Sequence, residues 1–407
     1  MIGAFLLAAA LAQGARPPLV VRPGGSLPTL TAALRDAHPG DTILVRAGSY
    51  REPVIYVDTP VTIIGQGSPV FDGGGAHEII VVRADGVTIR GLVLENVGAS
   101  YTDDRAALRL AGVHGCRIEG NRVVNGFFGV YASRVDGCVI AQNVITGTGR
   151  GESANANAIH LYASRNVTVD GNSVSGHRDG IYLEFTRRSV IRHNRSARNT
   201  RYGLHFMFSD SCDYAGNVFR DNAAGVAVMY SHVVTVTGNE FSGSRGSASY
   251  GLLLKELRDS RVERNRFVRN TVGLYLEGTD RTVIAGNEFT DCGWGVKLMA
   301  DADDADFEGN RFAGNSFDVA TNSRSTRARF HGNYWDRYAG YDLDHDGFGD
   351  VPFRPVRLFA LAVEQHPPAI ILARSFFMDL LDTAERVLPV LTPEAISDDR
   401  PLMRWPG

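Results

Sequence analysis

Short runs of alternating apolar and polar residues recur along most of this chain at a nearly constant interval. The recurring unit reads apolar-x-apolar-x-(Gly or another residue)-Asn-x-apolar, and successive Asn residues are 22, 29, 22, 23, 22, 26, 22, 23 and 23 positions apart. The repeated positions are Asn121, Asn143, Asn172, Asn194, Asn217, Asn239, Asn265, Asn287, Asn310 and Asn333. A fixed period of this length is typical of a repeat architecture, and the two long intervals indicate insertions around 146–157 and 243–250.

A second motif recurs with the same period as the first and consists of Gly followed by alternating apolar residues. It occurs at Gly129, Gly180, Gly203, Gly225, Gly251, Gly273 and Gly295. Alternation with a period of two predicts short strands, and Gly or Asn between them tolerates the left-handed backbone of a sharp corner. One coil cannot bury its own inner face, so the coils must stack. The sequence therefore predicts an all-β fold, a parallel β-helix with 22–23-residue rungs from about Asp41 to about Trp335.

The ends of the chain differ from the repeat. Residues 1–12 form an apolar segment, too short to span a bilayer, that ends in Ala10-Leu11-Ala12 and predicts a signal peptide; a buried N-terminal element is the alternative. Within the segment 13–40, Leu30–Ala37 is expected to form a short helix that caps the first rung. After the rungs come an Asp-rich segment, 336–356, and a tail, 357–407, with apolar residues at helical spacing.

Composition narrows the function classes. The net charge is −3 and no dense Lys/Arg run is present, which argues against a nucleic-acid partner. No stretch has the ~18 apolar residues of a transmembrane span. The four cysteines form no C-x-x-C motif, so a zinc ribbon is not indicated. Cys116 and Cys138 fall on consecutive rungs, where either stacked thiols or a disulfide fits.

The alternation also predicts which side chains point outward. The second position after Gly gives an outward column of Tyr131, His160, Tyr182, His205, Ala227, Leu253, Tyr275 and Lys297. The fourth position gives Ser133, Tyr162, Glu184, Met207, Met229, Lys255, Glu277 and Met299.

Three side chains of these columns form a candidate copper site. Rungs stack about 4.8 Å apart, so Met207 and Met229 are neighbours and His205 lies on the strand of Met207. Thioether and imidazole ligands favour Cu(I). Met299 lies about 14 Å beyond Met229 and serves only as a second contact or for a partner. The alternative is that these methionines fill gaps beneath a covering segment.

The commonest use of a β-helix by enzymes is on polysaccharides. Acid–base cleavage of a glycoside needs two carboxyl groups about 5–9.5 Å apart. The outward carboxylates Glu184 and Glu277 are four rungs, or about 19 Å, apart. This spacing argues against a lyase or hydrolase, which stays the alternative function together with a carbohydrate-binding solenoid.

Two features of the C-terminal part are candidate sites. Asp342, Asp344, Asp346 and Asp350 surround Gly347 with the spacing of a Ca²⁺-binding loop, although Phe353 stands where an EF-hand needs Glu. A plain acidic turn is the alternative. In the tail, Phe376, Phe377, Leu380 and Leu381 would dock onto a partner or pack along the solenoid.

Several segments resemble the NosD family, the periplasmic copper-site maturation proteins of nitrous oxide reductase. The resemblance covers almost the whole chain and includes GDTILVRAGSYRE, LHFMFSDSC, VAVMYS, GNYWDRYAGYDLDHDGFGDVPFRP and HPPAIILARSFFMDLLDTAERVLP. It implies a right-handed parallel β-helix in the periplasm that is not an enzyme. It also implies an ABC-type permease and ATPase, a copper chaperone lipoprotein and nitrous oxide reductase as partners, with Cu(I) as the metal handled.

Overall fold

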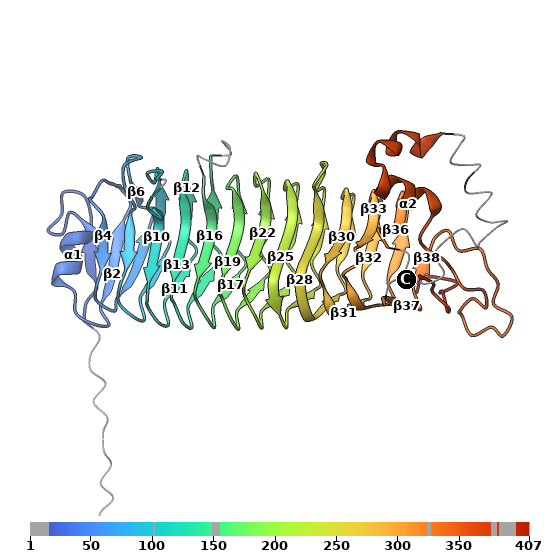
Figure 1. Ribbon diagram of the computed structural model, residues 1–407. Helices are drawn as coiled ribbons and strands as arrows, with labels where there is room; N and C mark the ends of the chain where they lie inside the picture. The colour runs from blue at the N-terminus through green and yellow to red at the C-terminus, as the bar shows by residue number, and fades with distance from the viewer. Residues whose placement is uncertain are drawn as a thin grey trace, which may run out of the picture.

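The computed structural model describes residues 16–100, 102–148, 155–323, 327–375, 381 and 396–406. Across these residues the chain winds into a right-handed parallel β-solenoid, as predicted (Figure 1). Two strands of a typical turn join a sheet of 25 strands, and the third joins a sheet of 13 strands.

The strands are short and all the ladders between them are parallel. The larger sheet contains β1 (Leu19–Val21), β2 (Thr42–Arg46), β4 (Ile55–Val57), β5 (Thr62–Gln66), β7 (Ile80–Val82), β8 (Thr88–Arg90), β10 (Ala106–Ala111), β11 (Arg117–Glu119), β13 (Phe128–Ser133), β14 (Val139–Ala141), β16 (Asn157–Tyr162), β17 (Thr168–Asp170), β19 (Asp179–Glu184), β20 (Val190–Arg192), β22 (Tyr202–Met207), β23 (Asp213–Ala215), β25 (Ala224–His232), β26 (Thr235–Thr237), β28 (Tyr250–Glu263), β30 (Val272–Glu277), β31 (Asp280–Ala285), β33 (Trp294–Leu298), β34 (Asp303–Glu308), β36 (Phe317–Thr321) and β37 (Arg329–His331). The smaller sheet contains β3 (Ser49–Tyr50), β6 (Val70–Asp72), β9 (Val93–Glu95), β12 (Arg122–Val124), β15 (Val144–Thr146), β18 (Ser173–Ser175), β21 (Arg195–Ala197), β24 (Val218–Arg220), β27 (Glu240–Ser242), β29 (Arg266–Val268), β32 (Glu288–Thr290), β35 (Arg311–Ala313) and β38 (Tyr334–Trp335).

The interior is one continuous column of apolar side chains. Aromatic rings stack along it from Phe219 through Phe241, Phe267, Phe289 and Phe312 to Trp335, with centroids 4.2–5.4 Å apart. All four cysteines are buried free thiols, and the backbone N–H of Cys116 donates to Cys138 Sγ at 3.3 Å. Of the two sequence-based alternatives, the structure therefore has stacked thiols.

The repeated asparagines form a buried ladder along one corner. Asn217 is typical: its Oδ1 accepts from the backbone N–H and Nδ2 of Asn194, at 2.9 and 3.0 Å. In turn its own backbone N–H and Nδ2 donate to Oδ1 of Asn239, both at 2.9 Å. Every bond between asparagines runs the same way, with donors on one rung and the acceptor on the next, and Nδ2 also donates to a backbone carbonyl of the preceding rung. The ladder satisfies the backbone where the corner interrupts the sheet.

The last rung is closed by a segment distant in sequence. Asp398 Oδ2 accepts from the backbone N–H and Nδ2 of Asn333, both at 3.0 Å, and from Trp335 Nε1 at 3.0 Å. Its side chain therefore replaces the next asparagine of the ladder. The segment 396–406 runs beside the last rungs without forming a helix, in contrast to the helical tail expected for 357–407.

Helices lie only near the two ends of the solenoid within the described residues (Figure 1). At the N-terminal end, α1 (Leu30–Asp36) begins at the N-cap Thr29 and buries Leu30 and Ala33 in the core. Near the C-terminal end, α2 (Leu358–Gln365) packs Phe359, Ala360 and Val363 against Phe317 and Ala320 of β36.

The 3₁₀ helix η1 (Pro367–Arg374) follows α2 and leaves Ile371 85% exposed. Leu381 packs against the apolar cluster under α2, whereas Phe376, Phe377 and Leu380 lie outside the described residues. The expected signal segment, 1–12, also lies outside them. Among the helices that are described, none has the length and apolar character needed to cross a membrane.

Candidate functional site

The outer face of β16, β19, β22 and β25 carries the predicted outward columns. In the ladder register, His160 pairs with Tyr182, Tyr182 with His205, and His205 with Ala227. Two residues further along each strand, Tyr162, Glu184, Met207 and Met229 follow one another in the same way. The register read from the sequence is therefore the register of the structure on this face.

Two thioether side chains and one imidazole lie on adjacent rungs of this face. Met207 and Met229 are direct partners in the parallel ladder between β22 and β25. Both side chains are half-buried, whereas His205, two residues before Met207, is only 6% exposed. The Tyr182 hydroxyl donates to Met207 Sδ at 3.6 Å. The strands thus place the three side chains on the same face of two adjacent rungs, and that they form one site stays a prediction.

Met299 is not part of this group. It follows β33, which is separated from β25 by β28 and β30. Its side chain is 9% exposed and its backbone N–H donates to Leu276 O at 3.0 Å. The geometry agrees with the expected separation from Met229.

A third outward column was missed in the sequence. It lies one position before the Gly of each rung, where Asn157 pairs with Asp179 and Tyr202 pairs with Ala224. Asp179 is fully buried. Strict alternation through Gly180 would place Asp179 on the inner face with Ile181, whereas in the structure its carboxylate lies beside Arg201 and His205. Only the residues after Gly were assigned to columns, so the acid beside His205 was overlooked.

Asp179 is held by an arginine on the next rung. Arg201 Nε donates to Asp179 Oδ1 at 2.8 Å, and Arg201 Nη2 donates to Oδ2. Burial alone would raise the pKa of Asp179, but the hydrogen bonds from Arg201 and the nearby His205 outweigh it and lower the pKa to about 2. The ionised Asp179 and Arg201 therefore form an ion pair beside His205.

Two tyrosines and one hydrogen bond fix the His205 ring. Tyr182 of the preceding rung stacks on it and Tyr202 of the same strand packs against it at a tilt, each with its ring centroid 4.7 Å from the imidazole centroid. Nδ1 lies 3.3 Å from Arg201 Nη2 and 3.7 Å from Asp179 Oδ2. No described residue hydrogen-bonds to the buried Nε2. A buried imidazole nitrogen without a hydrogen-bond partner, on the strand that also carries Met207, is a candidate ligand for a soft cation such as Cu(I).

Two other titratable groups of this face, His160 and Tyr182, are poorly suited to acid–base chemistry at neutral pH. Burial lowers the pKa of His160 to about 3 and raises the pKa of Tyr182 to about 12. A general acid or base works best with a pKa near the operating pH. Neither group meets that condition.

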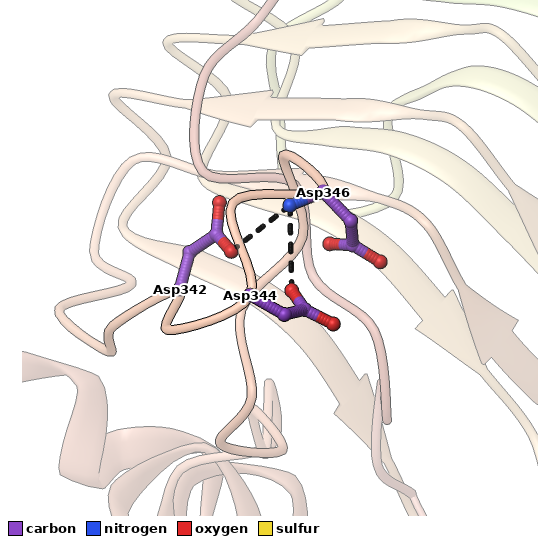
Figure 2. Close-up of side chains that lie close together, drawn as sticks. All are labelled: Asp342, Asp344 and Asp346. Atoms are coloured by element: carbon purple, nitrogen blue, oxygen red, sulfur yellow. Dashed lines mark hydrogen bonds between the residues drawn. The ribbon is translucent and has the colours of Figure 1, made fainter.

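The Asp-rich segment forms a second cluster near the C-terminal end (Figure 2). Oxygen atoms of Asp342, Asp344 and Asp346 lie within 4.8 Å of one another. The backbone N–H of Asp346 donates to Oδ1 of Asp342 and of Asp344, at 3.2 and 3.3 Å. Asp350 instead accepts from Leu343 N at 2.7 Å and is not one of the three clustered carboxylates. Three of the four acids of the predicted loop therefore lie close together, and Asp350 is the exception.

Comparison with known proteins shows the family of this chain. Residues 148–340, which include the whole His205 face, match the family model described as periplasmic copper-binding protein (NosD). A Pseudomonas aeruginosa protein, "Probable ABC transporter binding protein NosD", is 31% identical over 89% of this chain and 88% of its own length. The chain belongs to the NosD family. A NosD protein of the same description from Stutzerimonas stutzeri is 28% identical over 88% of this chain and 86% of its own length.

Solved structures are similar to this NosD chain in fold alone. The catalytic unit of a GH87 α-1,3-glucanase from Streptomyces thermodiastaticus covers 81% of this chain and 71% of its own, with a TM-score of 0.63 and 15% identity. The A-module of the mannuronan C-5 epimerase AlgE6 from Azotobacter vinelandii covers 75% of this chain and 94% of its own, with a TM-score of 0.55 and 14% identity. Function must therefore be argued from the site.

Proposed function

We propose that this NosD-family protein binds Cu(I) through His205, Met207 and Met229 on the outer face of its solenoid. The observation that carries the proposal is that Met207 and Met229 are direct partners in the parallel ladder, next to His205. The Nε2 atom of His205 has no hydrogen-bond partner among the described residues. Two thioethers and one imidazole are soft to borderline ligands, which favour Cu(I) over harder cations.

The surroundings of the three ligands support a site for transfer rather than permanent storage. Both methionines are half-buried, so a partner can reach their sulfur atoms, whereas the imidazole is buried and fixed. Three ligands satisfy Cu(I) while leaving one side open to an incoming donor or acceptor. The solenoid would thus hold the metal while another protein approaches from the solvent side.

In the cell, we propose that the protein is a periplasmic assembly factor for the copper centre of nitrous oxide reductase. It would receive Cu(I) from a copper chaperone lipoprotein and act with an ABC-type permease and ATPase. The names of the two curated relatives, which refer to an ABC transporter, support this association. The protein itself would catalyse no reaction, in keeping with the pKa values of His160 and Tyr182 far from neutrality.

The test replaces both sulfur ligands. We expect Met207→Ala with Met229→Ala to bind Cu(I) at least about 100-fold more weakly in competition with a chromogenic Cu(I) chelator, because two of three ligands are lost. The same variant should leave nitrous oxide reductase short of copper in cells. Met403→Ala is the matched control, since Met403 is half-buried near the C-terminus and far along the chain from the site.

Wild-type affinity and full reductase maturation in the double variant would contradict the proposal. Release of reducing or unsaturated ends from an anionic glycan by the wild-type protein would instead support a polysaccharide-acting solenoid.

We further propose that Asp342, Asp344 and Asp346 bind Ca²⁺ and so stabilise the C-terminal end. Carboxylate oxygens are the ligands that Ca²⁺ prefers, and the three lie within 4.8 Å of one another. Arg400 donates to Asp346 Oδ2 at 2.6 Å, so the loop is also tied to the segment that carries Asp398. Adding Ca²⁺ to chelator-treated protein should raise its Tm. An unchanged Tm, or an equal rise in Asp344→Asn, would count against the site.

A further inference from the structure

We infer that Tyr182 is a positioning residue for the proposed copper site: its ring supports the His205 imidazole, and its hydroxyl holds the sulfur of Met207 beside that imidazole. The inference rests on the proposed function, since it concerns two of the three proposed ligands. It adds a residue of the preceding rung that binds no metal itself but decides where one sulfur ligand lies.

His205 and Met207 must lean toward each other to bind one ion. Residues two apart on a strand carry their side chains on the same face, about 7 Å apart. Two atoms that each bind one cation at about 2.0–2.3 Å cannot be more than about 4.5 Å from each other. A methionine side chain is unbranched and flexible, so nothing in its own structure holds the sulfur on the required side. A contact that does so orders the ligand before the metal arrives.

Tyr182 contacts both side chains from the neighbouring strand, β19. It is the ladder partner of His205 and stacks on the imidazole, with the ring planes 23° apart and the centroids 4.7 Å apart. Its hydroxyl donates to Met207 Sδ at 3.6 Å. A phenol extends further from the backbone than an imidazole does. The hydroxyl therefore reaches past the edge of the imidazole and draws the sulfur toward that edge.

The imidazole presents its unbonded nitrogen on the same side. Nδ1 of His205 lies 3.3 Å from Nη2 of Arg201, which precedes it along the chain, whereas Met207 follows it. The two nitrogens lie on different sides of the ring, so Nε2 faces away from Arg201. This nitrogen is buried and has no hydrogen-bond partner among the described residues.

The hydrogen bond from Tyr182 does not use up the sulfur. A thioether sulfur has two lone pairs, and the hydroxyl takes one of them. The other is left for a soft cation such as Cu(I). Tyr182 can therefore hold Met207 in place while Met207 binds the metal.

Two other roles for the hydroxyl make different predictions. A buried phenol usually has a hydrogen-bond partner, so the bond to sulfur could serve stability alone. Under that role, loss of the hydroxyl would leave Cu(I) affinity unchanged. If the hydroxyl competed with Cu(I) for the sulfur, its loss would raise the affinity. Under our inference, its loss lowers the affinity.

The experiment measures the Cu(I) affinity of the full-length protein by competition with a chromogenic chelator. Tyr182→Phe removes the hydroxyl and keeps the ring against His205. We expect the affinity to fall about 10-fold, the lower limit for loss of a group that orients a metal ligand. Tyr131→Phe is the matched control, because Tyr131 occupies the same outward column two rungs earlier, and it should leave the affinity unchanged. An unchanged or higher affinity in Tyr182→Phe would overturn the inference.

A double-mutant cycle with Met207→Ala separates this inference from the proposed function. If Tyr182 acts through Met207, Tyr182→Phe should cause no further loss of affinity in the Met207→Ala background. An equal loss in both backgrounds would overturn the inference and leave the copper site intact. If Met207→Ala alone leaves Cu(I) affinity unchanged, the proposed ligand set fails and the inference fails with it.

Carbon NMR of the methionine methyl groups gives a readout in the metal-free protein. We expect the Met207 methyl signal to move in Tyr182→Phe toward the position of a freely rotating methionine, because the hydroxyl no longer holds the side chain. An unmoved signal would overturn the inference. If Tyr182→Phe does not fold, the wild type still decides: a freely rotating Met207 side chain in the metal-free wild type would overturn the inference, and a fixed one supports it.

Discussion

The asparagine ladder inside the solenoid and the outer face of β16, β19, β22 and β25 are built on the same rungs. The ladder repeats one residue from rung to rung, whereas the outer face changes its residue at each rung. In the ladder, nearly every rung repeats one residue with one set of bonds. On the outer face, successive rungs carry His160, Tyr182, His205 and Ala227 at the same register position. A residue repeated on every rung shows what the fold itself requires. A position that changes from rung to rung is free of that requirement and can serve another purpose.

The two regions also differ in how fully their polar atoms are satisfied. Both Nδ2 and Oδ1 of Asn217 are bonded to neighbouring rungs. On the outer face, the buried Nε2 atoms of His160 and His205 have no hydrogen-bond partner among the described residues. A buried polar atom without a partner costs about 1–3 kcal/mol, so this face is less stable than it would be if both nitrogens were bonded as the ladder atoms are.

The largest expected loss of stability comes from removing one asparagine of the ladder. Asn217→Ala removes the acceptor of Asn194 and the donor to Ile191 O, which lies 2.8 Å away. Several buried groups then lose their partners, so we expect the free energy of unfolding to fall by about 3–5 kcal/mol. Urea denaturation followed by circular dichroism measures it. Asn322→Ala, at an exposed Asn that accepts one bond from Ala300 N, is the control and should cost far less.

A smaller, pH-dependent loss of stability is expected from His160 on the outer face. The pKa of His160 is lowered to about 3 in the folded protein, from 6.5. As pH falls below about 6.5, the unfolded chain therefore binds a proton that the folded protein does not, and stability decreases. We expect His160 to account for a loss of about 2–3 kcal/mol between pH values of about 6.5 and 4.5.

His160→Phe should flatten this part of the stability curve, as measured by urea denaturation at each pH. Equal slopes for the variant and the wild type would show that His160 is not kept neutral by burial.

The smallest effect concerns the corner beside the methionines. Phe208 follows Met207, has a left-handed backbone (φ 49°) and is 41% exposed, with its ring stacked between Phe185 and Tyr230. Asn tolerates this backbone better than Ala does. We expect Phe208→Asn to be more stable than Phe208→Ala by about 0.5–1 kcal/mol in thermal unfolding. The reverse order would show that the corner backbone changes when the ring is removed.

The ladder and the outer columns could be predicted because a period of two within a repeat fixes register. That logic correctly paired Met207 with Met229 and placed His205 beside them. It could not place Asp179 on the outer face, because the alternation breaks at Gly180, where a Cβ would meet the buried Ser196 and Asn199. It had no means to find Asp398, which meets Asn333 across 65 positions and belongs to no repeat. Contacts made by unrepeated segments carry no periodic signal, so only the folded structure shows them.

Asp398 has a consequence that follows from the direction of the asparagine bonds. Because every side-chain carbonyl of the ladder accepts from the preceding rung, the C=O dipoles of the asparagines add along the solenoid. The column has a negative end near Asn121 and a positive end at Asn333. A carboxylate at the positive end neutralises it, as acidic residues do at the N-terminus of an α-helix. Without Asp398, that end would offer bare donors to the first rung of another molecule and favour head-to-tail association.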